Sequence, residues 1–196
     1  MKKLLVVALV FAFISCTKNQ NPRVLISTQL GDIEAEIYIE KAPVTAANFL
    51  RYVDSLKYNN NQVCFYRIVR LDNQPDNLIK IEVIQGGYGK DSLIEIYQFP
   101  PIKHETTKQT GVRHTDGVLS MARREPGTAS SEFFICVGDQ PELDFGGKRN
   151  PDGQGFAAFG KVYKGMEVVR KIQQLKDNLQ YLGNPVKIIS ISRIEE

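Results

Sequence analysis

The residues best suited to chemistry are short blocks that surround one arginine, Arg67, with aromatic and apolar side chains. Each block is weak alone, and the set becomes specific through its order. Arginine stays charged and presents planar, directed N–H groups. A donor fixed beside an apolar pocket can bind a transition state better than a ground state. The blocks are, in chain order, Phe65-Tyr66-Arg67, Gln85-Gly86-Gly87, Ser120-Met121-Ala122, Phe133-Phe134-Ile135, Leu143-Asp144 and Phe159-Gly160-Lys161-Val162.

Other reactive residue types form weaker patterns. His104 and His114 have no metal-ligand spacing with each other or with the cysteines, and both are predicted to be loop residues. Cys64 and Cys136 each lie in an apolar, strand-like run, which favours small buried side chains. A disulfide between them stays conceivable in an exported protein. We therefore predict no metal or cofactor.

The N-terminus is typical of an export signal. Residues 1–16 begin with two lysines and contain an apolar run, Leu4 to Ile14, that suits a signal peptide but is too short to span a bilayer. The run ends in Phe13-Ile14-Ser15-Cys16, which resembles the lipobox of bacterial lipoproteins and implies a lipid anchor on the cysteine. An ordinary signal cleaved nearby is the alternative. Residues 17–23 are predicted to be a tether and 24–196 the folded domain.

Length and charge limit the remaining possibilities. A chain of 196 residues fits one domain with a sizeable core. Its formal net charge is +3, and without residues 1–16 there are 23 basic and 22 acidic residues. No long basic run is present, so there is no electrostatic reason to expect a nucleic-acid partner. We expect a monomer.

Short strands dominate the predicted secondary structure. Residues 33–39 alternate apolar and polar side chains, as in a strand with one wet face, and pair with 24–30 as a hairpin. Pro43 suits the first turn of a helix that runs to about residue 55, and a second helix is expected at 165–175. Many strands with two helices favour a closed antiparallel barrel. Further strands are expected at 63–70, 80–85, 118–122, 133–137, 156–163 and 186–194, and irregular stretches at 88–117 and 138–155.

In these blocks and their order, the chain resembles the cyclophilins, the peptidyl-prolyl cis/trans isomerases, over residues 24–194. The resemblance implies a mainly β fold, a closed eight-stranded antiparallel β-barrel capped by two α-helices. It implies that Arg67 is the catalytic arginine and that Gln85 holds the peptide backbone and orients the arginine. Tyr66 replaces a histidine of the family's motif, and strand alternation predicts that it points away from the groove.

The resemblance also implies a peptide-binding groove. Its substrate-binding residues would be Phe65, Val83, Met121, Ala122, Arg123, Glu132, Phe134, Leu143 and Phe156. Ordinary barrel core is the competing interpretation for the apolar members. Glu82, Glu132 and Glu142 stand where the family usually has a phenylalanine, a glutamine and an aromatic residue. We expect them to give the groove an acidic rim, and a carboxylate near Arg67 could either orient it or compete with the substrate.

The predicted function is that of a lipid-anchored isomerase in the bacterial envelope, facing the periplasm. It would bind proline-containing segments of exported proteins and assist their folding. The alternative is a proline-peptide-binding module or holdase chaperone with little turnover, favoured by Glu82 and Glu132. A glycosidase-like pair of Glu132 and Glu142 is a third possibility, but nothing positions it around a sugar. Residues 71–80 form an extra loop, which either selects substrates or is a neutral insertion.

Overall fold

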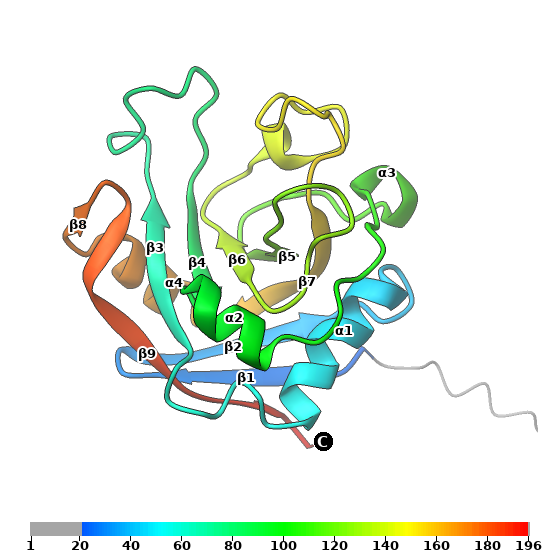
Figure 1. Cartoon of the computed structure of the whole chain (residues 1–196), viewed down its shortest axis with the longest axis vertical. Helices are drawn as coiled ribbons and strands as arrows, with labels where there is room; N and C mark the ends of the chain where they lie inside the picture. The colour runs from blue at the N-terminus through cyan, green and yellow to red at the C-terminus, as the bar shows by residue number, and fades with distance from the viewer. Residues whose placement is uncertain (1–20, 196) are drawn as a thin grey trace, which may run out of the picture.

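A computed structural model describes residues 21–195, which form a closed β-barrel (Figure 1). The sheet order is β1-β2-β7-β5-β6-β4-β3-β9-β8, and β1 also pairs with β9. This last pairing closes a ring of eight antiparallel strands, whereas β8 only extends the hairpin with β9. The predicted mainly β, eight-stranded antiparallel barrel is confirmed. The strands are β1 (Arg23–Thr28), β2 (Gly31–Ile37), β3 (Cys64–Val69), β4 (Val83–Gly87), β5 (Val118–Met121), β6 (Phe133–Cys136), β7 (Ala157–Lys164), β8 (Asp177–Asn178) and β9 (Tyr181–Arg193).

Residues 21–195 contain four α-helices, not the two that the sequence predicts. The expected helices are α1 (Pro43–Asp54), which packs against β7 and β9, and α4 (Met166–Gln173), which packs against β2, β3 and β4. The additional helices, α2 (Asp91–Tyr97) and α3 (Thr107–Thr110), lie within the stretch 88–117 that the sequence predicts to be irregular. Helices this short carry too little periodicity to be recognised. No helix within the described part of the chain is long and apolar enough to cross a membrane.

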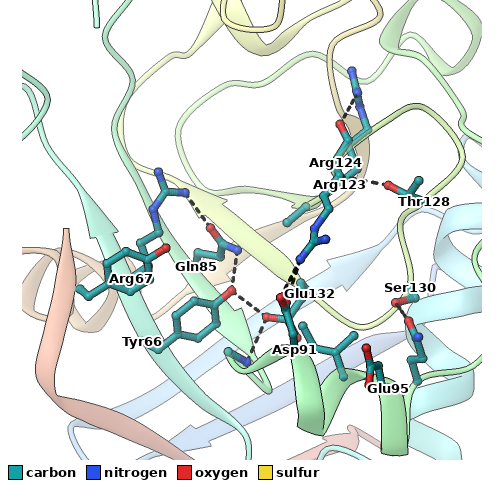
Figure 2. Close-up of a pocket in the computed structure, with 15 residues that line it drawn as sticks. Tyr66, Arg67, Gln85, Asp91, Glu95, Arg123, Arg124, Thr128, Ser130 and Glu132 are labelled. Atoms are coloured by element: carbon teal, nitrogen blue, oxygen red, sulfur yellow. Dashed lines mark hydrogen bonds and ion pairs between the residues drawn. The ribbon is translucent and has the colours of Figure 1, made fainter. Parts of the chain in front are cut away.

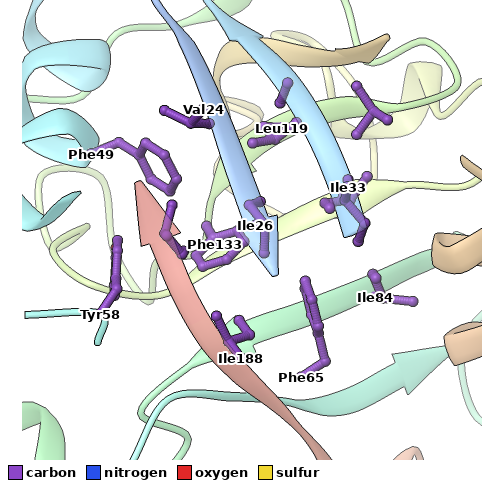
Figure 3. Packing of buried hydrophobic residues seen from close by; sticks show 14 of the residues in the cluster. Val24, Ile26, Ile33, Phe49, Tyr58, Phe65, Ile84, Leu119, Phe133 and Ile188 are labelled. Carbon is purple, nitrogen blue, oxygen red and sulfur yellow. The ribbon is translucent and has the colours of Figure 1, made fainter. Parts of the chain in front are cut away.

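One hydrophobic core fills the barrel and extends beneath α1 (Figure 3). Every second side chain of β1 and β2 is buried, as the alternating pattern predicts. Phe49 of α1 is an aromatic centre of this core, because its ring lies 5.5 Å from that of Phe133 and 5.0 Å from that of Phe159. Close packing of this kind limits the movement of the strands. The barrel wall is therefore a rigid support for side chains on its outer face.

A β-bulge in β3 turns two successive side chains toward the same side. In the pairing with β4, Phe65 lies opposite Gly86 and Arg67 lies opposite Gln85, so Tyr66 has no partner residue. A bulge of this type re-aims side chains and is frequent next to active sites. Tyr66 and Arg67 consequently line the same cavity. The prediction that Tyr66 points away from the groove is wrong, because strict alternation fails at the bulge.

Candidate active site

Two cavities meet at Arg67 on the outer face of the barrel. The smaller one, about 260 Å³, has an apolar wall and is called the apolar cavity below. The rings of Phe134 and Phe156 meet edge to face there, with centroids 5.3 Å apart. Such a wall can hold a small apolar ring and exclude water from it. The apolar wall consists of Ile81, Val83, Phe134, Leu143 and Phe156, four of which the sequence predicts to bind substrate.

The larger cavity, about 460 Å³, is lined mostly by polar and charged residues, is called the polar cavity below, and lies beside the apolar cavity (Figure 2). Part of its wall comes from α2, which contributes Asp91 and Glu95. Gln98, the residue that follows this helix, also lines the cavity. Ala122 and Arg123 line both cavities, as do Arg67 and Gln85. An extended chain could therefore occupy both cavities while passing over Arg67.

The guanidinium of Arg67 is held from two sides. Its Nη1 donates to Oε1 of Gln85 at 2.9 Å, and its Nη2 and Nε donate to Oε1 of Gln180 at 2.6 and 3.1 Å. Gln180 lies in the two-residue turn between β8 and β9, where it and Leu179 both have positive φ values of 75° and 49°. Two-residue hairpin turns with positive φ at both positions usually contain Asn-Gly. Leu-Gln is not such a pair, so the sequence predicts neither this turn nor the contact of Gln180 with Arg67.

A chain of hydrogen bonds continues from Gln85 to a buried carboxylate (Figure 2). Nε2 of Gln85 donates to the Tyr66 hydroxyl at 2.6 Å, and that hydroxyl donates to Oε2 of Glu132 at 2.7 Å. Glu132 also accepts from two backbone N–H groups of residues 88–89. Every donor points toward Glu132, so the amide of Gln85 keeps its oxygen toward Arg67. The chain thereby orients the arginine.

Burial determines the protonation of the two groups at the end of this chain. Burial raises the pKa of Glu132, and the hydrogen bonds from Tyr66 and from the backbone oppose this rise. Burial also raises the pKa of Tyr66 far above its usual range, and the nearby charge of Glu132 raises it further. Tyr66 therefore stays protonated and remains a hydrogen-bond donor.

The three glutamates do not form the predicted acidic rim. Glu82 is half-buried and its Oε1 lies 3.5 Å from Nε2 of Gln173 in α4, while Ile81 lines the apolar cavity. Glu132 borders the polar cavity but is bound beneath it, and Glu142 accepts from the backbone N–H of Lys148 at 2.8 Å. The rim prediction is wrong because Glu82 and Glu142 line neither cavity, which leaves Glu132 as the one of the three that borders the site.

Two other predicted substrate-binding residues lie elsewhere. The side chains of Phe65 and Met121 are fully buried in the hydrophobic core and line neither cavity. Phe65 precedes the bulge, and its ring packs edge-on against Phe133 inside the barrel, with centroids 5.9 Å apart. Their assignment to the substrate is corrected, because both side chains point to the interior face of their strands.

The cysteines are poorly reactive side chains, Cys136 buried and Cys64 half-buried. Cys64 and Cys136 are both free thiols in the structure, so the conceivable disulfide is absent. Burial raises the pKa of Cys64 to about 11 and that of Cys136 well above its usual value. A thiol must ionise to act as a nucleophile. The interpretation of both as small hydrophobic side chains fits the structure.

A buried set of polar residues supports the apolar cavity from behind. Nδ1 of His114 lies 2.7 Å from Oδ1 of Asp144, and Nε2 lies 2.9 Å from Oγ of Ser120. This order resembles that of a nucleophile and its base, but Ser120 is completely inaccessible. His114, a loop residue as predicted, instead stacks on Phe134 with centroids 6.0 Å apart. Burial would raise the pKa of Asp144, but hydrogen bonds from His114 lower it.

Comparison with known proteins agrees with this geometry. The family described as cyclophilin type peptidyl-prolyl cis-trans isomerase/CLD matches residues 23–195. The chain belongs to the cyclophilins. It is 37% identical to a peptidyl-prolyl cis-trans isomerase of Acinetobacter baylyi over 177 residues, which cover 87% of this chain and 85% of that protein. It is 36% identical to peptidyl-prolyl cis-trans isomerase B of Escherichia coli, over 74% of this chain and 80% of that protein.

A solved structure shows the same fold. The cyclophilin-type isomerase of Cryptosporidium parvum superposes with a TM-score of 0.70 at 22% identity, covering 90% of this chain and 99% of that chain. From its family and curated relatives, the chain is a peptidyl-prolyl cis-trans isomerase. The glycosidase interpretation is set aside.

Proposed function

We propose that Arg67 accelerates rotation about X–Pro bonds by donating to the prolyl nitrogen of a peptide whose proline ring occupies the apolar cavity. The observation that carries this proposal is the arginine's position, fixed by three hydrogen bonds at the edge of that cavity. Gln85 and Gln180 are neutral amides, so they orient the guanidinium without neutralising its charge. That charge remains available to the substrate.

The energies are consistent with this arrangement. Rotation about the peptide bond has a barrier of about 18–20 kcal/mol because resonance keeps the amide planar. In the twisted state the prolyl nitrogen regains a lone pair, which a fixed donor binds better than it binds the planar amide. An acceleration of about 10⁵ requires about 7 kcal/mol of differential stabilisation. One fixed donor contributes about 2.7–4 kcal/mol of this, and the apolar ring pocket would contribute the rest.

NMR exchange spectroscopy on a short Ala-Pro peptide tests the proposal without a coupled protease. A cyclophilin-type isomerase of Cryptosporidium parvum was solved in the presence of the dipeptide Ala-Pro. We expect Arg67→Ala to reduce the exchange rate by about 10²-fold or more, as loss of one transition-state donor does elsewhere. Arg67→Lys should recover little, because lysine lacks the planar fork. Lys171→Gln, on the exposed side of α4, is the control.

The same measurement separates the isomerase from a binding module. Chemical shift changes without enhanced exchange in the unmodified protein would support the holdase alternative. Unchanged exchange in a folded Arg67→Ala protein would remove the arginine from the mechanism. Two-dimensional amide spectra of each variant establish that the fold is intact.

The proposal includes a location in the cell envelope. It is supported by the signal-like pattern of residues 1–16 and the lipobox-like sequence before Cys16, which lie outside the described residues. The clients are proline-containing segments of exported proteins, reached from a lipid anchor on Cys16. Metabolic labelling with a radioactive fatty acid should mark the protein, and Cys16→Ser should abolish the label. A mature protein without lipid and cleaved at another position would contradict the anchor.

A further inference from the structure

The apolar cavity carries an unusual excess of positive charge. Three arginines line it, namely Arg67, Arg123 and Arg149. Within residues 21–195, no aspartate or glutamate lines this cavity. A proline ring is neutral, so the ring alone does not explain three cations on one wall.

One of the three arginines is neutralised by the protein. Arg123 forms a two-pronged ion pair with Asp152, at 2.8 and 2.9 Å, and donates to the carbonyl of Gly155. Its side chain is only 1% exposed, and its guanidinium lies 5.2 Å from the centroid of the Phe156 ring. Arg123 therefore shapes the cavity and offers little charge to a ligand.

The other two arginines have only neutral partners. Arg67 donates to the amides of Gln85 and Gln180, and Nη1 of Arg149 donates to the carbonyl of Ile79 at 2.6 Å. Neither arginine takes part in an ion pair among the described residues. Burial lowers the pKa of Arg149, and the charge of Arg67 lowers it further. Two like charges thus face one cavity, an arrangement that an anion between them would relieve.

The extra loop 71–80 holds both cations in place. Its Ile79 carbonyl is the partner of Arg149, and its Asn73 carbonyl accepts from Nε2 of Gln180, which in turn holds Arg67. Gln74, completely buried, fastens the loop by donating to the carbonyls of residues 70 and 81. The loop is therefore connected to the site, which argues for substrate selection and against a neutral insertion.

We propose that a peptide carboxylate close to the proline binds between Arg67 and Arg149, so that the preferred substrates are X–Pro segments with an acidic group beside the proline. The proposal deepens the function proposed above, since it concerns the same cavity. The carboxylate can come from an acidic side chain before or after the proline, or from the free C-terminus of a chain that ends in proline. Arginine guanidinium groups suit carboxylates because the two planar groups form paired hydrogen bonds.

The test compares four tetrapeptides that each contain one proline. The neutral reference is Ala-Ala-Pro-Gln with both ends blocked, and the first acidic peptide is Ala-Ala-Pro-Glu with both ends blocked. Ala-Glu-Pro-Ala, also blocked, and Ala-Ala-Ala-Pro with a free C-terminus distinguish the sources of the carboxylate. Dissociation constants come from NMR titration and turnover from exchange spectroscopy, both at low salt.

We expect at least one acidic peptide to bind about five- to tenfold more tightly than the neutral reference. The preference should disappear near 1 M salt, where the screening length is about 3 Å compared with about 30 Å at 0.01 M. Arg149→Gln should reduce the ratio of the two dissociation constants to below about twofold, and Arg149→Lys should retain part of it. Lys171→Gln removes one positive charge from α4 and should leave the ratio unchanged.

The outcomes separate the carboxylate site from the function proposed for Arg67. Equal binding of all four peptides at low salt, or a preference that survives in a folded Arg149→Gln protein, would overturn the carboxylate site. Normal turnover of the neutral peptide alongside equal binding would leave the function of Arg67 intact. Loss of turnover for every peptide would instead contradict the function proposed for Arg67, whatever the binding ratio.

Discussion

Replacing Tyr66 with phenylalanine tests whether the hydrogen-bond chain from Glu132 to Arg67 controls the site. The change removes one hydroxyl, which donates to Glu132 at 2.7 Å and accepts from Gln85 at 2.6 Å. A hydrogen bond to a charged group contributes about 1.5–3 kcal/mol. We expect the free energy of unfolding to fall by about 2 kcal/mol, which lowers the melting temperature by about 4–8 °C in a protein of this size.

The same substitution should slow the isomerisation. Without the hydroxyl, Nε2 of Gln85 has no acceptor on that side, so the amide can rotate and no longer fixes Nη1 of Arg67. Loss of about 1.4 kcal/mol of transition-state stabilisation corresponds to a tenfold lower rate. Gln180 still holds two of the donors of Arg67. We therefore expect kcat/KM to fall by about three- to tenfold, less than in Arg67→Ala.

The stability loss should also depend on pH through Glu132. Burial raises its pKa above the usual value of 4.5, so the folded protein binds this proton more readily than the unfolded chain does. The associated stability is present below pH 4.5 and is lost as the pH rises through the folded-state pKa. The Tyr66 hydroxyl opposes this loss by stabilising the ionised form. The difference in unfolding free energy between Tyr66→Phe and the unmodified protein should therefore be larger at pH 8 than at pH 4.

Tyr181→Phe is the matched control for this experiment. Tyr181 lines the same polar cavity and stacks on Tyr66, with centroids 6.5 Å apart, but its hydroxyl makes no hydrogen bond within residues 21–195. Urea unfolding at both pH values and NMR exchange spectroscopy measure the two effects. Equal losses in the two variants, or a loss for Tyr66→Phe that does not change with pH, would refute the reasoning.

Two further predictions concern the turn between β8 and β9. Gln180→Ala removes the acceptor of two Arg67 donors and should lower kcat/KM about tenfold in the exchange assay. Retention of the full rate would show that Gln85 alone orients the arginine. Leu179→Asn should raise the free energy of unfolding by about 1 kcal/mol in urea titrations, because leucine at φ 49° is strained and asparagine tolerates that conformation. The Leu179 side chain is 79% exposed, so its replacement removes little buried apolar surface. A decrease in the free energy of unfolding would contradict the assignment of strain.

Most of the fold could be predicted from the sequence, because its strands have one buried and one exposed face. In residues 33–37 the alternation of apolar and acidic side chains matches the observed burial of β2. Proline at the first position of α1 and the apolar stripe that follows identify that helix in the same way. Helices α2 and α3 escape prediction because, with seven and four residues, they are too short to show a helical period. The β8–β9 turn escapes because its residues are not the usual ones for positive φ.

Some residues of the candidate site could likewise be predicted from the sequence, and others could not. Sequence patterns identify the Arg67–Gln85 pair and most of the apolar wall, since these depend on residue types in ordered blocks. They misplace Glu82 and Glu142, because a carboxylate's effect depends on which donors surround it. Tyr66 is misplaced because one bulge reverses the face on which it lies.

The sequence by itself predicts a closed antiparallel barrel from the alternation and number of its strands, and its resemblance to the cyclophilins predicts one arginine beside an apolar pocket. Only the tertiary structure decides the charge of that pocket. Glu82 lies against Gln173 of α4 and does not line it, while Arg149 is held at its wall by the carbonyl of Ile79. These contacts join residues far apart in the chain, and the electrostatic interaction of two groups depends on their distance in space. The apolar cavity is consequently basic, and of the three glutamates expected at its rim Glu132 alone borders the polar cavity beside it.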